Sequence, residues 1–297
     1  MHYRTLGSTG LDVSVIGIGT WQFGGEWGKQ FAQDEVDAMF ARGHDLGLNL
    51  IDTAECYGDH LSESLIGRAI EGKRDQWILA TKFGHKFHKP FERTEPRRPQ
   101  DVIDQLVDSL KALRTDHIDL LQYHSWGDDQ FLNAGVLEAL LRAKEQGLFR
   151  FLGNSVGSNG NVKQVAASQD MQIEAIQIIY NRIDRKPEEE VFDVCRQQNL
   201  GVLARVPLAS GFLSGKYKPG QQFPVGDVRE RQKRETIDAK LAEVETIARE
   251  EVPSGVAMSQ WALAWCLKQD VVTSVIPGCK SVEQVEHNAA AANLVEQ

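Results

Sequence analysis

The chain has 297 residues, of which 41% are hydrophobic and 25% charged, proportions that are ordinary for a globular protein. Its 33 lysines and arginines against 42 aspartates and glutamates give a net charge of −9, which argues against a nucleic acid or an anionic membrane surface as the main partner. No apolar run approaches the ~18 residues of a membrane span, and the N-terminus carries no signal-peptide core. We therefore expect a cytoplasmic protein with no membrane partner.

The four cysteines are scattered and show no C-x-x-C spacing (Cys56, Cys195, Cys266 and Cys279). In a cytoplasmic protein, cysteines in this pattern are typical of reduced thiols rather than of a disulfide or zinc framework. We therefore expect no metal site.

Hydrophobic periodicity and turn residues predict an N-terminal hairpin and then a regular alternation of strands and helices. The hairpin covers residues 3–13, around a Gly-Ser-Thr-Gly turn. Strands are predicted at 13–20, 48–52, 76–81, 118–123, 149–153, 175–179, 202–205 and 272–276. Helices are predicted at 35–46, 62–70, 99–113, 135–145, 161–167, 187–197, 236–250, 256–268 and 281–291. Long loops are predicted at 84–99, 125–134 and 216–234.

Eight strand-then-helix units in about 300 residues favour an α/β fold of the (β/α)8 TIM-barrel type, preceded by the hairpin. No Gly-x-Gly-x-x-Gly follows the first strand, which removes the usual argument for a doubly wound dinucleotide-binding sheet. Composition does not change along the chain, so we expect one domain over residues 1–297.

Polar residues end three neighbouring strands of this predicted barrel. Asp52 ends the second strand, Lys82 the third and His124 the fourth, and Tyr57 lies in the loop just after Asp52. The active site of such a barrel lies at the carboxyl ends of the strands. Because a buried carboxylate requires a partner, we expect Asp52 and Lys82 to pair, with Tyr57 and His124 beside them.

These four side chains suggest a proton relay. An ammonium favours the phenolate form of a neighbouring tyrosine, so we expect Lys82 to lower the pKa of Tyr57. Tyr57 can then give a proton to a carbonyl oxygen as negative charge builds there, while His124 orients that oxygen. The residues include no source of electrons, so a hydride would come from a cofactor.

At this point the sequence resembles the aldo-keto reductase family over nearly its whole length. The resemblance rests on G-I-G-T-W at 17–21, N-L-I-D-T-A-E-C-Y-G at 49–58, A-T-K at 80–82, D-L-L-Q-Y-H at 119–124, R-F-L-G-N-S at 150–155, Q-I-I-Y-N at 177–181, P-L-A-S-G-F-L-S-G-K-Y at 207–217 and V-I-P-G-C-K-S-V-E-Q-V-E-H-N at 275–288. It implies that Asp52, Tyr57, Lys82 and His124 form a catalytic tetrad with Tyr57 as proton donor. It also implies a nicotinamide cofactor, mostly NADPH, although NADH is possible.

The resemblance places the cofactor across the barrel mouth. Ser155 and Gln177 match positions that bind the carboxamide, although Val156 replaces the asparagine that usually follows the serine. Where the family often stacks an aromatic ring on the nicotinamide, this chain has Arg205, and we expect its planar guanidinium to lie over the ring instead. The cofactor-binding prediction comprises Thr20, Trp21, Ser155, Gln177, Arg205, Pro207, Leu208, Ser210, Gly211, Lys216, Gly278, Lys280, Ser281, Gln284 and Asn288.

Three further expectations concern the 2′-phosphate of the cofactor, the substrate pocket and one loop. Lys280, and the helix that begins after Ser281, suit a 2′-phosphate, although Gln284 stands where strongly NADP-selective members often have arginine. The substrate pocket is predicted to contain Trp21, Tyr57, His124 and Trp126, while the glycine-rich residues 24–28 are interpreted as a mobile loop.

The sequence leaves several functions open. The first is NADP(H)-dependent reduction of aldehydes or ketones to alcohols, with a small-molecule carbonyl or sugar as substrate. A sugar or polyol dehydrogenase using NAD(P) is a second. A nicotinamide-binding regulatory subunit, resembling the β-subunits of potassium channels, is a third, and a class I aldolase with Lys82 as nucleophile is a fourth. The sequence gives neither the physiological substrate nor the oligomeric state.

Overall fold

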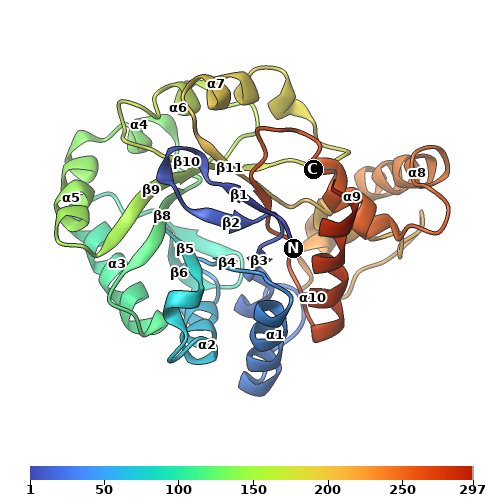
Figure 1. The fold of residues 1–297 in the computed structure, drawn as a ribbon, viewed down its shortest axis with the longest axis horizontal. Coiled ribbons are helices and arrows are strands. Elements are labelled where there is room, and N and C mark those ends of the chain that lie inside the picture. The colour runs from blue at the N-terminus through green and yellow to red at the C-terminus, as the bar shows by residue number, and fades with distance from the viewer. Residues whose placement is uncertain (296–297) are drawn as a thin grey trace.

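The computed structural model describes residues 1–295, in which eight parallel strands form one sheet surrounded by helices (Figure 1). Neighbouring strands follow the order β12-β11-β10-β9-β8-β5-β4-β3. Parallel bridges from Ile16 to Val275 and from Gly19 to Gly278 join the two edges and close the barrel. The strands are β3 (Ile18–Gly19), β4 (Leu50–Asp52), β5 (Ile78–Phe83), β8 (Ile118–His124), β9 (Phe149–Ser155), β10 (Ala175–Ile179), β11 (Gly201–Arg205) and β12 (Ser274–Val275).

A helix follows each barrel strand, so the predicted eight strand-then-helix units are confirmed. The helices that complete these units are α1 (Gln33–Asp45), α2 (Leu61–Ala69), α3 (Pro99–Leu113), α5 (Ala134–Glu145), α6 (Val162–Ala166), α7 (Val191–Gln197), α9 (Met258–Cys266) and α10 (Val282–Ala289). Two more helices, α4 (Asp128–Phe131) and α8 (Arg234–Glu250), are additions to the barrel. Within the described residues, no helix is both long and apolar enough to cross a membrane.

Helix α3 illustrates how the sequence specifies these elements. Pro99 occupies its first turn, where a missing N–H costs no hydrogen bond. Val102, Leu106 and Leu110 recur at helical spacing and are buried in the main core. The helix ends at Leu113, and the capping residue Arg114 has a left-handed backbone conformation.

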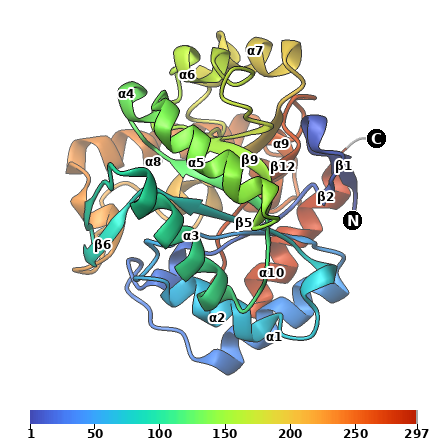
Figure 2. The same cartoon turned by 90° about the vertical axis from the view of Figure 1, so that its left-hand side faces the viewer.

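The predicted N-terminal hairpin pairs β1 (Tyr3–Thr5) with β2 (Asp12–Ser14) and closes the amino-terminal end of the barrel. Its apolar residues Leu6 and Val13 are fully buried, in one cluster with side chains from inside the barrel. A Cβ on Gly7 would lie 2.1 Å from the backbone nitrogen of Gly201, so only glycine permits this approach. Figure 2 shows this hairpin at one end of the barrel and the β6 strand at the other.

Several predicted boundaries were wrong. Residues 84–99 form a second hairpin rather than a plain loop, with β6 (Lys86–Lys89) paired to β7 (Glu92–Thr94). These strands are largely exposed, so they lack the apolar run that marked the barrel strands. The predicted loop 125–134 contains α4, and the predicted strand 13–20 divides between β2 and β3. Hydrophobic periodicity does not encode which short segments pair or coil locally, so it could not predict these boundaries.

Candidate active site

The ends of β4 and β5 bring Asp52 and Lys82 into contact. The ammonium of Lys82 donates to Asp52 Oδ2 at 2.8 Å, to the Thr53 carbonyl oxygen at 2.8 Å and to the Tyr57 hydroxyl at 3.3 Å. These contacts use all three of its N–H donors. The structure therefore brings together three of the four predicted tetrad residues in one hydrogen-bonded group.

The second oxygen of Asp52 is held from the opposite side of the barrel. Gln177 on β10 donates to Asp52 Oδ1 at 2.6 Å, and Gln122 on β8 donates to the same oxygen at 3.2 Å. The backbone N–H and hydroxyl of Thr20 both donate to the Asp52 carbonyl oxygen. This carboxylate is therefore fixed in position. Sequence reasoning missed Gln122, although it lies two residues before the strand-end His124.

The pKa of Tyr57 corrects one prediction. Burial raises the pKa of the phenol, and the opposing effect of the Lys82 ammonium is smaller, so the pKa is raised to about 12 rather than lowered. Tyr57 therefore keeps its proton at neutral pH. The predicted direction of the pKa shift of Tyr57 was therefore wrong. A protonated phenol is nevertheless the form that can donate a proton, as the prediction requires.

Lys82 remains charged. Burial alone lowers the pKa of its ammonium, but the adjacent Asp52 and Tyr57 together raise it more, and the net pKa is raised. A protonated amine whose donors are all engaged is not a nucleophile. This environment argues against the class I aldolase alternative.

His124 lies at the edge of the same group, and its side chain is 14% exposed. Its ring is 6.0 Å from the Tyr57 ring and nearly perpendicular to it. Burial, with the nearby positive charge of Lys82, lowers the pKa of the imidazole well below its usual value, so the ring is neutral at pH 7. Its Nδ1 faces Cys56, with 3.6 Å between Nδ1 and Sγ.

Trp21 is held above Tyr57 by a buried carboxylate. The two rings are stacked, with centroids 6.3 Å apart, and the indole N–H of Trp21 donates to Glu26 Oε2 at 2.6 Å. Glu26 also accepts from the Phe91 backbone N–H and from the guanidinium of Arg93. The interpretation of residues 24–28 as simply a mobile loop was therefore wrong, because Glu26 is fully buried and joins this loop to the β6–β7 hairpin.

The side chains predicted to bind the nicotinamide lie on neighbouring strand ends. Ser155 donates to Gln177 Oε1 at 3.3 Å, so these two predicted carboxamide ligands are in contact. Arg205 donates to the Val156 carbonyl oxygen at 3.0 Å, while its Nε is buried without a partner among the described residues. Burial lowers the pKa of this guanidinium. A half-buried cation with an unused donor at the barrel mouth fits an aromatic or anionic ligand.

The segment from Pro207 to Lys216, which holds five residues of the cofactor-binding prediction, follows β11 in a strained backbone. Val206, Ala209 and Ser210 all have positive φ, and the Ser210 carbonyl oxygen accepts from Arg229 at 3.4 Å. Pro207 and Leu208 lie in the same turn, where the Leu208 carbonyl oxygen accepts from the Gly211 N–H. The exposed side chain of Lys216 makes no hydrogen bond within the described residues.

The charged run 229–234 is typical of a solvated loop, with contact to an adenosine phosphate as the less favoured alternative, but its first residue, Arg229, is buried. Its guanidinium pairs with Asp227, donates to the Tyr217 hydroxyl at 2.9 Å and lies 4.2 Å from the Phe223 ring centroid. A β-bridge from Asp227 to Trp27 then joins loop 216–234 to the loop that carries Glu26. The barrel mouth is thus crossed by connected loops.

The last predicted segment opens helix α10. Ser281 caps the helix by accepting from the Gln284 N–H, and Gln284 Oε1 accepts from the Lys280 N–H at 2.9 Å. Asn288 donates to the Gly278 carbonyl oxygen at 3.4 Å. A Cβ on Gly278 would lie 2.0 Å from the Gln22 side chain, so a glycine at this position leaves room for Gln22.

The Lys280 ammonium donates to the Trp27 carbonyl oxygen at 2.9 Å, beside Arg229. A lysine just before a helix N-terminus fits a phosphate group. Trp126 lies elsewhere: its side chain is 3% exposed and its indole N–H donates to the Gly84 carbonyl oxygen, within the aromatic core. In this structure Trp126 supports the loop rather than an open pocket.

The model of the Aldo/keto reductase family matches residues 15–297. The chain is 31% identical over 297 residues to the uncharacterized oxidoreductase YqkF of Bacillus subtilis, covering 99% of this chain and 92% of that protein. It is 30% identical over 291 residues to the Schizosaccharomyces pombe aldo-keto reductase yakc, whose name specifies NADP(+), covering 95% and 84%.

Two solved structures are also similar. The holo form of aldo-keto reductase AKR11C1 from Bacillus halodurans has a TM-score of 0.80 and 29% identity, covering 98% of this chain and 91% of that chain. The glycerol dehydrogenase AKR11B4 from Gluconobacter oxydans has a TM-score of 0.83 and 26% identity, and the match covers 99% of this chain and 91% of that chain.

Proposed function

The chain belongs to the aldo/keto reductase family, and from this premise we propose that it is an NADPH-dependent reductase of aldehydes or ketones. The observation that carries the proposal is the Lys82 ammonium placed between the Asp52 carboxylate and the Tyr57 hydroxyl. This group can deliver a proton to a carbonyl oxygen without any further residue. Turnover in the reverse direction, from alcohol to carbonyl, uses the same atoms.

Each residue has one task in the proposed reaction. The nicotinamide cofactor, when bound, supplies a hydride to the carbonyl carbon. The Tyr57 hydroxyl gives its proton to the carbonyl oxygen, and the Lys82 ammonium stabilises the phenolate that remains. Asp52 keeps Lys82 in place, and the neutral imidazole of His124 donates a hydrogen bond that orients the carbonyl.

The proposed preference for NADPH rests on charge. Lys280 lies just before the start of α10, where a 2′-phosphate would gain a cation and the positive end of the helix dipole. The NADP(+) in the name of the Schizosaccharomyces pombe relative is consistent with this. Arg205 would lie against the nicotinamide, and Ser155 with Gln177 would bind its carboxamide.

A second candidate, a polyol dehydrogenase, is favoured by one observation, the likeness to the Gluconobacter oxydans glycerol dehydrogenase. Such a dehydrogenase would use the same four residues to oxidise an alcohol instead of reducing a carbonyl. A panel of aldehydes and ketones with NADPH, and of polyols with NADP+ and NAD+, separates the two candidates by their kcat/KM values.

The test of the proposed function compares wild type with Tyr57→Phe. We expect the variant to lose reductase turnover while binding NADPH nearly as tightly, because only the proton donor is removed. Binding is followed by quenching of tryptophan fluorescence, to which Trp21 contributes, with NADH titrated in parallel. Retained turnover in Tyr57→Phe would overturn the assignment of the donor, and failure of folded wild type to bind either nucleotide would overturn the reductase.

A further inference from the structure

Glu55, two residues before Tyr57, is a buried carboxylate that the proposed proton relay does not use. Its side chain is 2% exposed, and its Oε1 accepts from the His85 backbone N–H at 2.8 Å. Its Oε2 has no hydrogen-bond partner within the part of the chain that the structure describes. Buried carboxylate oxygens are normally bonded, so this oxygen has an unused capacity to bind a proton or a cation.

Two further metal-binding atoms face this oxygen. The Sγ of Cys56 lies 3.6 Å from the Nδ1 of His124, and Glu55 Oε2 lies 4.0 Å from the same nitrogen. All three atoms lie within 4.8 Å of one another. Around a tetrahedral zinc ion, with bonds of about 2.0–2.3 Å, neighbouring ligand atoms lie about 3.3–3.6 Å apart. Small side-chain movements would therefore bring these atoms onto one ion.

We propose that Glu55, Cys56 and His124 form a binding site for one divalent transition-metal ion of the zinc class, with a fourth position open to water. Carboxylate, thiolate and imidazole are all ligands that zinc accepts. On binding, the thiol proton of Cys56 and any proton on Glu55 leave to solvent, and metal–ligand bonds replace them. The expectation of no metal site, which rested on C-x-x-C spacing, considered only ligands that are close in sequence.

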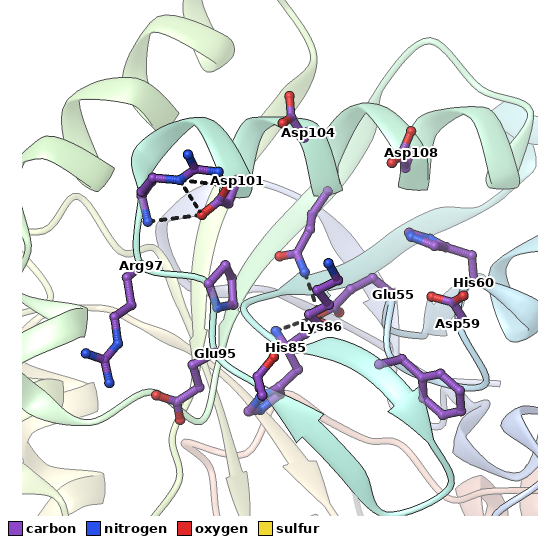
Figure 3. A pocket seen from close by; sticks show the side chains of 15 residues that line it. Glu55, Asp59, His60, His85, Lys86, Glu95, Arg97, Asp101, Asp104 and Asp108 are labelled. Atoms are coloured by element: carbon purple, nitrogen blue, oxygen red, sulfur yellow. Dashed lines mark hydrogen bonds and ion pairs between the residues drawn. The ribbon is translucent and has the colours of Figure 1, made fainter.

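An acidic cavity borders Glu55, one of the three proposed ligands. The cavity has a volume of about 490 Å³, and Glu55 and His85 line it (Figure 3). Its other acidic residues are Asp59, Glu95, Asp101, Asp104 and Asp108. Lys86, Arg97 and Arg98 also line it, but Arg98 is paired with Asp101. Carboxylates therefore outnumber cations on the cavity wall, which favours the approach of a positive ion to Glu55.

An ion at this site would act on the proposed active site through His124. It would bind Nδ1 and restrain the imidazole, which lies beside the Tyr57 ring. The Nε2 on the other side of the ring would still carry its proton. Metal binding is measured directly, so its outcome does not depend on the proposed reduction.

The experiment titrates chelator-treated full-length protein with Co²⁺, which is a spectroscopic probe for zinc sites. We expect one equivalent to produce visible bands of a four-coordinate ion and a near-ultraviolet band from thiolate-to-cobalt charge transfer. Zn²⁺ should remove both bands by displacement. Cys56→Ser should lose the thiolate band, and the isosteric Glu55→Gln should bind at least tenfold more weakly.

Two controls locate the ion. Cys279→Ala removes another buried thiol outside the cluster and should leave the spectrum unchanged. Asp104→Asn removes a carboxylate from the cavity wall and should affect only the affinity. Absence of stoichiometric binding by wild type, or a thiolate band that survives Cys56→Ser, would overturn the proposal. Binding without a thiolate band would place the ion on the acidic cavity wall and would overturn it equally.

Discussion

The Lys82 ammonium lies 2.8 Å from Asp52 Oδ2, and the two side chains are only 1% and 5% exposed. Removing one partner of such a pair leaves an uncompensated buried charge, which costs about 3–5 kcal/mol. We therefore expect Asp52→Asn to lower the free energy of unfolding by about this amount. Urea denaturation at pH 7, followed by circular dichroism, measures it.

The double variant Asp52→Asn/Lys82→Met is the control for this pair. It removes both charges, so we expect it to recover part of the stability lost in Asp52→Asn. We expect no turnover in the double variant, because Lys82 is missing. A double variant that is less stable than Asp52→Asn would contradict the assignment of the loss to an unpaired ammonium.

The buried Glu26 is expected to determine the stability of the loops over the barrel mouth. Its carboxylate accepts from Trp21, Phe91 and Arg93, so Glu26→Ala would leave these donors unpaired. An unsatisfied buried donor costs about 1–3 kcal/mol, and we expect the free energy of unfolding to fall by at least that much. Arg98→Ala, which breaks an exposed pair near the same hairpin, should cost much less than Glu26→Ala. Equal losses in the two variants would rule out this role for Glu26.

Arg205 tests the proposed contact with the nicotinamide. A cation over an aromatic ring contributes about 0.5–2 kcal/mol, so we expect Arg205→Met to weaken NADPH binding by about 2- to 30-fold. Arg205→Lys keeps the charge but loses the planar group, so its affinity for NADPH should lie between those of wild type and Arg205→Met. Fluorescence titration measures the affinities. Unchanged binding in Arg205→Met would remove this residue from the nicotinamide site.

The eight-unit barrel and the grouping of the tetrad were predictable for one physical reason. Parallel strands in a closed barrel bring their carboxyl ends to the same rim, so Asp52, Lys82 and His124 had to lie near one another once the strands were assigned. Strand ends are visible in sequence because an apolar run stops at a polar residue. The catalytic roles of these residues stay predictions.

The loops were not predictable in the same way. Glu26 and Arg93 are 67 positions apart in exposed-looking segments, and only the folded loops place them in contact. The raised pKa of Tyr57 was not predictable either, because burial outweighs the Lys82 ammonium and the burial of this side chain is a property of the folded protein. His124 is likewise brought by the fold to the adjacent residues Glu55 and Cys56, across 68 positions of sequence.

The pair formed by His60 and Glu63 gives a prediction for stability against pH. His60 Nδ1 contacts the buried carboxylate of Glu63. Burial alone lowers the pKa of His60, but the hydrogen bond and the charge of Glu63 raise it more, so the net pKa is raised above 6.5. The folded protein therefore holds this proton more tightly than the unfolded chain. The resulting stability is fully present below the unfolded pKa and is lost as pH rises through the folded pKa.

His60→Asn tests this linkage, and asparagine suits the backbone because φ at this position is +64°. We expect the loss of unfolding free energy in His60→Asn to be largest below about pH 6 and to shrink steadily as the pH rises past the folded pKa. Urea denaturation at several pH values measures the difference. In a Glu63→Gln background the pH dependence of this difference should decrease, because the partner charge is gone. A loss that is constant with pH in the wild-type background would mean that the histidine contributes by packing alone.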